Sequence, residues 1–229
     1  MKLGDLFPDF KAETSFGTIE SFHDWVGNSW CILFSHPADF TPVCTTELAK
    51  AVQLFPEFKK RNVKMIALSC DSAESHKKWK EDIICFGQQN KTLGSDIKIE
   101  NFPFPIIADD KRVLAHQLEM LDPEEIGKDG IALTARAVFV VDSTKKLKLS
   151  ILYPATTGRN FDEILRVIDS LQLTAVKKVA TPVNWNVGDK CMVIPSLSSE
   201  EVKNIFGDDV ESIDLPSKKQ YLRMTPMPQ

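Results

Sequence analysis

Short apolar runs alternate with longer stretches of helical spacing along the first half of the chain. Three of the short runs predict buried strands, at residues 30–35, 63–69 and 104–108. Between the first two runs, apolar residues recur at helical spacing behind Thr41 and Pro42. This pair is typical of a helix start, because threonine caps a helix well and proline suits its first position. The order strand, helix, strand predicts a βαβ unit.

Helical and extended patterns keep alternating after the second strand. The expected elements are a helix from Ser72 to about Phe86, a polar loop over 88–101, a short helix over 111–118, a turn-rich connection over 122–130, a hairpin of strands over 135–141 and 147–153, and a helix over 160–171. Alternating strands and helices with a late antiparallel hairpin predict an α/β fold with a mixed central sheet flanked by helices. A thioredoxin-like fold is one instance, and the pattern alone leaves the choice among such folds open.

The composition changes near the carboxyl terminus. From Thr174 to Pro182 the chain turns polar and basic, which is typical of a linker, and the remaining residues are rich in turn formers. We therefore expect a main domain over 1–175 and a small C-terminal domain over 176–229.

Composition and charge narrow the functional classes. With 43% hydrophobic and 26% charged residues, the chain of 229 residues has the balance of a globular protein that folds in water. A net charge of −4 and only short basic runs argue against nucleic acid as a partner. The first residues lack the apolar stretch of a signal peptide, and no apolar run is long enough for a membrane span. We expect a cytoplasmic protein without integral membrane association.

The cysteines point to thiol chemistry. They number five, with no C-x-x-C pair, at positions 31, 44, 70, 85 and 191. This set predicts neither a disulfide framework nor a metal site, and we expect no cofactor. Most free cysteines are small buried hydrophobes, and core packing is the expectation for Cys31, Cys70 and Cys85.

One cysteine lies in a motif with a mechanical reason at each position. The segment 36–47 follows the first predicted strand and leads into the helix. With Thr41 as the cap and Pro42 as the first helical residue, Cys44 takes the third position, near unpaired N–H groups and the positive end of the helix dipole. These groups favour the thiolate, which is the nucleophilic form. The Thr41 hydroxyl is placed to bond the sulfur or a bound oxygen, and Pro37 can wall off water.

A single arginine interrupts the apolar strand over 135–141. A buried cation is costly unless it faces an anion, and a Cys44 thiolate would meet that need of Arg136. The alternative is an arginine on an edge strand that points to solvent.

Several stretches resemble the one-cysteine peroxiredoxins of the peroxiredoxin-6 subfamily, within the AhpC/TSA-like thiol peroxidases. They cover most of the chain and include 34–48, 133–136, 153–173 and 180–185. The resemblance implies a thioredoxin fold, a homodimer with contacts from the C-terminal extension, and Cys44 as the peroxidatic nucleophile. It also implies that Pro37, Thr41 and Arg136 complete the peroxide site. Two further residues of the motif are expected beside the site without touching substrate, His36 and Glu47.

The implied activity is the reduction of hydrogen peroxide and of organic hydroperoxides, lipid ones included, to water and alcohols, in antioxidant defence and redox homeostasis. In two-cysteine relatives, a second cysteine, in a Val-Cys-Pro segment, resolves the sulfenic acid of the peroxidatic cysteine. This chain lacks such a segment. Cys191 is the one cysteine of the extension, and packing is its better interpretation. An external thiol such as glutathione is the implied reductant.

Other functions stay open at this point. The subfamily is also credited with a calcium-independent phospholipase activity linked to a G-x-S-x-G-like segment, here 27–31 with Ser29, and to a histidine, here His23. Cys31 replaces the final glycine and Asn28 the family's aspartate, so the nucleophile turn differs from the motif. A non-enzymatic holdase would not need Pro37, Thr41, Cys44 and Arg136 together, and disulfide exchange would need C-x-x-C. The loop over 88–102 is longer than the family's usual one and has no assigned role.

Overall fold

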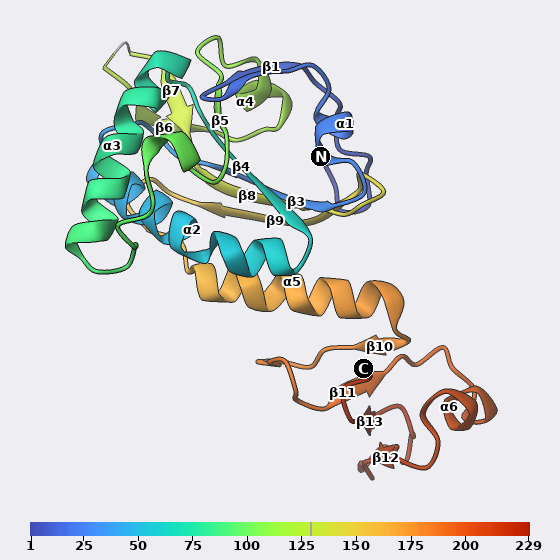
Figure 1. Ribbon diagram of the computed structural model, residues 1–229. Helices are drawn as coiled ribbons and strands as arrows, with labels where there is room; N and C mark the ends of the chain where they lie inside the picture. The colour runs from blue at the N-terminus through green and yellow to red at the C-terminus, as the bar shows by residue number, and fades with distance from the viewer. Residues whose placement is uncertain (129) are drawn as a thin grey trace. The chain divides into compact units, whose positions relative to one another are not determined.

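The chain forms two compact units in the computed structural model, which describes residues 1–128 and 130–229 (Figure 1). The first unit covers residues 1–161 and the second 162–229. Composition placed the domain boundary later, at 175. The expected linker over 174–182 contains the end of helix α5 (Phe161–Val176) and strand β10 (Val179–Ala180), so these residues form regular structure.

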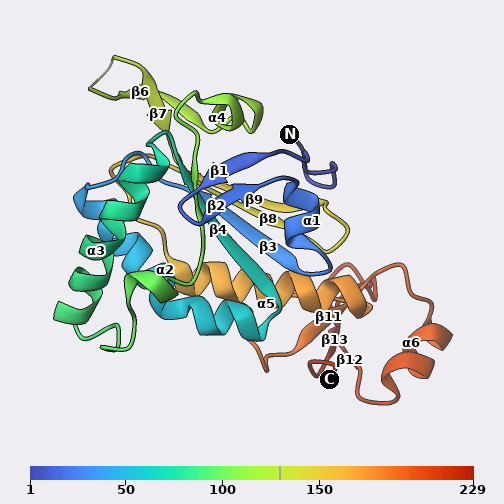
Figure 2. The same cartoon turned by 45° about the horizontal axis from the view of Figure 1, so that its top comes forward.

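A seven-stranded sheet organises the first unit, in the order β2-β1-β5-β4-β3-β8-β9 (Figures 1 and 2). Its strands are β1 (Ala12–Thr14), β2 (Gly17–Ile19), β3 (Trp30–Ser35), β4 (Val63–Ser69), β5 (Ile106–Ala108), β8 (Arg136–Val141) and β9 (Leu147–Tyr153). Strands β3, β4 and β5 are parallel, whereas β8 is antiparallel to β3 and to β9. The mixed sheet and the late hairpin are confirmed.

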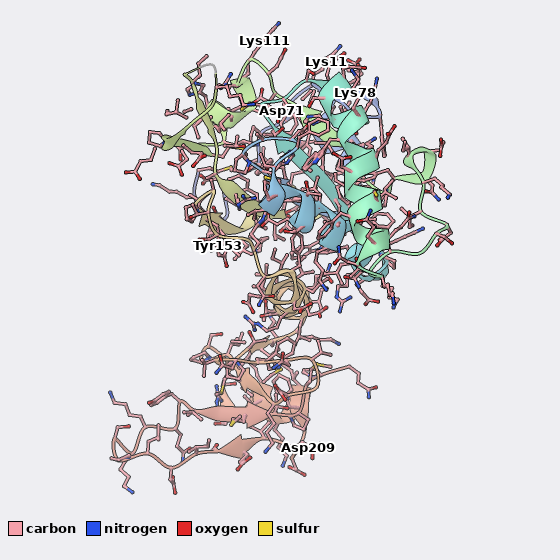
Figure 3. The ribbon with its side chains drawn as sticks, turned by 90° about the vertical axis from the view of Figure 1, so that its left-hand side faces the viewer. Lys11, Asp71, Lys78, Lys111, Tyr153 and Asp209 are labelled. Carbon is pink, nitrogen blue, oxygen red and sulfur yellow. The ribbon has the colours of Figure 1, made fainter. Side chains whose placement is uncertain are left out.

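Helices α2 (Pro42–Lys60) and α3 (Ala73–Gln89) connect the parallel strands, as the βαβ pattern predicted, and the 3₁₀ turn η1 (Ile99–Asn101) lies between α3 and β5. Two short helices lie outside these connections, α1 (Phe22–Val26) before β3 and α4 (Val113–Gln117) after β5. Ser72 caps α3 by accepting from the Ser75 N–H. Lys78 of α3 is exposed (Figure 3), while Trp79 is buried and donates to Thr45 of α2 at 3.1 Å. This contact joins the two helices that follow β3 and β4.

One expectation for this unit was wrong. The segment over 122–130, taken as a turn-rich connection, includes most of β6 (Leu121–Ile126), which pairs with β7 (Ala132–Thr134) in a separate two-stranded sheet. Residue 129 lies outside the described residues. Most of β6 is exposed or half-buried, and a ribbon with little buried surface needs no apolar alternation. The pattern therefore carried no strand signal.

The second unit has its own small sheet, in the order β10-β11-β13-β12. Its further elements are β11 (Cys191–Val193), helix α6 (Ser199–Phe206), β12 (Glu211–Ser212) and β13 (Arg223–Thr225). Val179, Trp185 and Cys191 form its buried cluster. No helix in the described parts of the chain is long and apolar enough to cross a membrane.

Candidate active site

Thr41 and Pro42 open α2 as their side chains favour. Thr41 is the N-cap residue with an extended backbone (φ −115°, ψ 149°), and Pro42 is the first helical residue. Phe40 just before them has a left-handed backbone (φ 54°), which turns the chain sharply into the helix. The Thr41 hydroxyl does not cap the helix but donates to the Ala38 carbonyl at 2.9 Å. Its oxygen therefore keeps lone pairs that can accept a further hydrogen bond.

Cys44 occupies the third position of α2, and its side chain is fully buried. The N–H groups of this first turn have no carbonyl four residues earlier within the helix, so the helix leaves them without an internal acceptor. Arg136, the first residue of β8, places Nη1 at 3.3 Å from Cys44 Sγ. Its side chain is buried on a strand between β3 and β9, not on an edge.

A buried carboxylate holds this arginine in place. Glu47, one helical turn after Cys44, accepts from Arg136 Nη1 at 2.7 Å. Arg136 Nε also donates to the Ala155 carbonyl at 2.9 Å. These bonds to Glu47 and Ala155 fix the guanidinium group with Nη1 directed at the Cys44 sulfur. An anion site needs such a preorganised donor.

A second arginine in the site, Arg159, was not among the residues proposed from the sequence. Its Nε and Nη2 donate to the two oxygens of Glu47 at 3.0 and 2.8 Å, and its Nη1 donates to the carbonyls of Ser35 and Ala137. Glu47 was the signal that could have found it. A carboxylate between Cys44 and Leu48 on an apolar helix must be buried, and a buried carboxylate needs cations.

These charges leave a positive balance beside Cys44. Burial favours the neutral form of Glu47, but the charges and hydrogen bonds of Arg159, and then the charge of Arg136, outweigh it and lower the pKa of this carboxyl. Two guanidinium groups then face one carboxylate, so one net positive charge remains next to the sulfur. Such a site stabilises an anion, whether a thiolate or a leaving oxygen.

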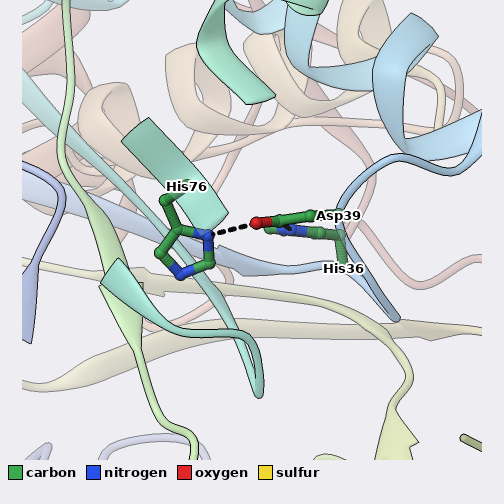
Figure 4. A group of neighbouring side chains, drawn as sticks. All are labelled: His36, Asp39 and His76. Atoms are coloured by element: carbon green, nitrogen blue, oxygen red, sulfur yellow. Dashed lines mark hydrogen bonds and ion pairs between the residues drawn. The ribbon is translucent and has the colours of Figure 1, made fainter. Parts of the chain in front are cut away.

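The loop from β3 to α2 covers this arrangement. Pro37 is buried in it directly after His36, whose backbone carbonyl accepts from Thr134. The His36 side chain is fully buried and bonds to Asp39 at 2.8 Å (Figure 4). The structure thus brings Pro37, Thr41, Cys44 and Arg136 into one region at the carboxyl end of β3.

Comparison with known proteins agrees with this geometry. The family model described as "AhpC/TSA family" matches residues 3–150, and the one described as "C-terminal domain of 1-Cys peroxiredoxin" matches residues 170–208. This chain belongs to the AhpC/TSA family, as a one-cysteine peroxiredoxin. It is 63% identical to the 1-Cys peroxiredoxin of Onchocerca volvulus, over 98% of this chain and 97% of the relative. It is 58% identical to Peroxiredoxin-6 of Homo sapiens, over 99% of this chain and 97% of the relative.

Solved structures give the same assignment. A cysteine-to-serine mutant of the peroxiredoxin 6 of Arenicola marina superposes with a TM-score of 0.93 at 56% identity, covering 100% of this chain and 99% of the other. A yeast mitochondrial 1-Cys peroxiredoxin superposes with a TM-score of 0.84 at 43% identity, covering 99% of each chain. The peroxiredoxin therefore has the thioredoxin-like fold of its family, and it is a thiol peroxidase.

A groove of about 520 Å³ lies beside the peroxiredoxin site, between the start of α2 and the second half of α3. Its walls include Thr41, Pro42 and Thr45 from α2, and Cys85 and Phe86 from α3. The groove is open to molecules from solution and lies next to the first turn of α2, the turn that carries Cys44.

The other four cysteines have different environments. Cys31 and Cys191 are buried, and burial is the main cause that raises the pKa of each thiol above its ordinary value. Cys70 is half-buried against the main core. Cys85, for which we expected core packing, is exposed and accepts from Gln89 at 3.2 Å. The apolar pattern of α3 continues past Ile84, but Cys85 falls on its outer side.

Ser29 and His23 have separate partners. The Ser29 hydroxyl donates to the Asn62 side chain at 2.8 Å, and the His23 ring bonds to the Phe7 carbonyl through Nε2 at 2.7 Å. The two side chains are not bonded to each other among the described contacts. A Ser–His arrangement for nucleophilic attack requires such a bond.

Proposed function

We propose that Cys44 is the peroxidatic residue of this thiol peroxidase. The observation that carries the proposal is the contact of 3.3 Å between Arg136 Nη1 and Cys44 Sγ, inside a buried site with a net positive charge at a helix start. The guanidinium contact, the net positive charge and the helix start each stabilise a sulfur anion relative to the neutral thiol.

In the proposed reaction the thiolate attacks one peroxide oxygen in line with the O–O bond. An S–O bond forms, the O–O bond breaks, and its electron pair leaves with the distal oxygen, which takes a proton and departs as water or an alcohol. Arg136 and the Cys44 N–H donate to the peroxide oxygens. Thr41 accepts from the peroxide hydroxyl, because its own hydrogen is donated to Ala38. Pro37 keeps water from the sulfur, and Cys44 becomes a sulfenic acid.

We infer that both hydrogen peroxide and organic hydroperoxides, including those of lipids, are substrates. The support is the groove beside Thr41 and Pro42, which offers room for an organic group while the peroxide oxygens reach the buried sulfur. A role in antioxidant defence and redox homeostasis follows from this chemistry.

We also propose that the reductant is an external low-molecular-weight thiol such as glutathione. The yeast mitochondrial 1-Cys peroxiredoxin has a thiol resolving mechanism via glutathione and thioredoxin systems. Here the thiol would attack Cys44–SOH to give a mixed disulfide and water, and a second thiol would then release the Cys44 thiolate and a disulfide. Burial of Cys31 and Cys191 supports an outside thiol over either of these two.

The assembly and location are proposals of the same kind. We propose a cytoplasmic homodimer in which the extension over 176–229 takes part in the contacts. The match of residues 170–208 to the C-terminal domain of 1-Cys peroxiredoxin supports the extension as a family feature, and five free cysteines suit a reducing compartment. Sedimentation of the full chain tests the dimer, and cell fractionation tests the compartment.

A serine scan of the cysteines tests the assignment of Cys44. We expect Cys44→Ser to abolish peroxide consumption with glutathione as reductant, while the same change at positions 31, 70, 85 and 191 leaves turnover largely intact. Coupled turnover assays and the mass of the peptide with Cys44 after one equivalent of peroxide give the readout. A comparable loss from Cys85→Ser or Cys191→Ser would reject the one-cysteine mechanism.

A further inference from the structure

A buried carboxylate, Asp39, lies between two histidines in the loop that precedes Cys44 (Figure 4). His36 Nε2 is 2.8 Å from Asp39 Oδ1, and His76 Nδ1 of α3 is 2.7 Å from Oδ2. All three side chains are at most 1% exposed. The mechanism proposed above gives this cluster no task.

The hydrogen-bond partners of His76 show where its protons lie. His76 Nε2 is 3.0 Å from the carbonyl of Ile107, which can only accept, so this nitrogen carries a hydrogen. Its Nδ1 faces Asp39 Oδ2, which also accepts from the Ser75 hydroxyl. Burial alone would raise the pKa of Asp39, but hydrogen bonds from His36 and His76 lower it well below its ordinary range, so the group is a carboxylate. His76 therefore donates from both nitrogens and is an imidazolium.

The other histidine is neutral for the same kind of reason. His36 Nε2 donates to Asp39, and its Nδ1 is buried with no hydrogen-bond partner in the described residues. Burial lowers the pKa of His36 more than Asp39 raises it. The Nδ1 atom is then an unprotonated lone pair, and a buried lone pair without a partner is tolerated better than a buried N–H without an acceptor.

The surroundings of the cluster favour protons over a metal ion. The same three side chains have ligand atoms close enough to share an ion. A metal on His36 Nε2 would move the ring hydrogen to Nδ1, where it would be a buried donor without an acceptor among the described residues. His76 with a hydrogen on each nitrogen satisfies both of its acceptors, Asp39 and the Ile107 carbonyl, without an ion.

We propose that His76 and Asp39 form a buried ion pair that positions the loop over 36–41, and with it Pro37 and Thr41, above Cys44. Besides the two histidines and Ser75, Asp39 is tied through its backbone N–H to Asp71 Oδ2 at 2.9 Å, in the turn between β4 and α3 (Figure 3). Asp39 lies two residues from Pro37 and two from Thr41. The loop is thus fastened to the start of α3 at its centre.

The loop depends on the His76 cation. The charged groups that face Asp39 are His36 from the end of β3, His76 from α3 and Asp71 from the turn before α3. Removal of the His76 side chain would leave a buried carboxylate without its cation, which is costly. The loop would then lose its fixed position, and the reaction of Cys44 with peroxide would slow.

Nitrogen NMR of the full-length, metal-free protein labelled at histidine tests the charge directly. The chain has four histidines, so His→Gln variants assign every signal. At pH 7 we expect His76 protonated at both nitrogens, and His36 protonated only at Nε2. A neutral His76, or histidine signals that shift on addition of one equivalent of Zn²⁺ alone, would overturn the proposal. This measurement does not depend on the assignment of Cys44.

Kinetics test the positioning role, which rests on the proposed function of Cys44. We expect His76→Gln to slow the oxidation of Cys44 by about 10- to 100-fold, as displaced reactive groups do. His116→Gln, the same change at an exposed histidine, should stay within about threefold of wild type. A folded His76→Gln variant with the wild-type rate would reject the positioning role. Peroxide consumption that survives Cys44→Ser would instead reject the proposed function.

Discussion

Glu47 receives hydrogen bonds from two buried arginines, Arg136 and Arg159, one helical turn beyond Cys44. Because it binds both, it sets the distance between the cations and the sulfur, and it neutralises only one of them. The same carboxylate therefore supports the structure and tunes the electrostatic field at the Cys44 sulfur. At this scale the site consists of one thiol and an incompletely neutralised pair of cations.

The first prediction at this scale concerns Arg136. We expect Arg136→Met to slow the reaction of Cys44 with hydrogen peroxide by about 10²- to 10³-fold, the usual cost of one preorganised donor. Arg136→Lys should recover only part of this loss, since an ammonium keeps the charge but not the planar fork that reaches Cys44, Glu47 and Ala155 together. Stopped-flow fluorescence gives the rate, and thiolate absorbance at neutral pH gives the ionised fraction. If Arg136→Met stays within about twofold of wild type in both, this arginine is structural.

Among the elements, α3 shows how local chain geometry shapes the surroundings of the site. Its last turn closes on Gly87, whose carbonyl accepts from the backbone N–H groups of Thr92 and Leu93. The long segment that follows α3 thus starts with a tight turn folded back onto the helix. A Cβ at Gly87 would lie 2.4 Å from Leu93 Cδ1 and 2.6 Å from its Cγ.

The prediction at the element scale follows from this contact. Alanine is normally better than glycine inside a helix by about 1 kcal/mol. We expect the opposite sign for Gly87→Ala, a loss of about 1–3 kcal/mol in the free energy of unfolding, because the clash reaches the Cγ of Leu93 and not only its flexible end. Urea unfolding measures it. The double variant Gly87→Ala/Leu93→Ala should lose less free energy of unfolding than the sum of the two single-variant losses. Strict additivity would contradict the clash.

For the whole molecule, buried carboxylates link stability to pH. The pKa of Glu47 and that of Asp39 are both lowered in the folded protein, against the effect of burial, by arginines in one case and by histidines in the other. The unfolded chain therefore takes up protons at higher pH than the folded one. Their stabilisation is complete above the ordinary carboxyl pKa of about 4 and is lost as the pH falls through the folded values.

The corresponding prediction compares wild type with Glu47→Gln. The variant should be less stable at pH 7 by about 3–5 kcal/mol, because two buried arginines lose their anion. It should also lose less stability than wild type between about pH 5 and pH 3, since one of the linked carboxyls is gone. Urea midpoints across this range, with Glu81→Gln as the control at an exposed carboxyl, provide the measurement. Equal acid slopes for wild type and Glu47→Gln would contradict the assignment.

Short-range features of this chain were predictable because neighbouring residues decide them. The start of α2 depends on Thr41 and Pro42, which act within one turn, and the place of Cys44 follows by counting. Strands β3, β4, β5, β8 and β9 of the main sheet were visible because buried segments must be apolar, whereas the short, partly exposed β1 and β2 were not predicted. The ribbon of β6 and β7 was not, since its partly exposed residues meet no such requirement.

What only the tertiary structure decided depends on contacts across the chain. Glu47 meets Arg136 and Arg159 at separations of 89 and 112 residues, which follows from the pairing of β8 with β3 and cannot be read from either segment alone. The same is true of Asp39 and His76, and of the exposed face on which Cys85 lies. The sequence by itself determined the start of α2 and the apolar strands of the main sheet, and it singled out Cys44 as the candidate thiol, because local sterics and hydrogen bonding suffice for these features. The surrounding charges required the fold, because a buried ion is acceptable only where distant partners converge on it.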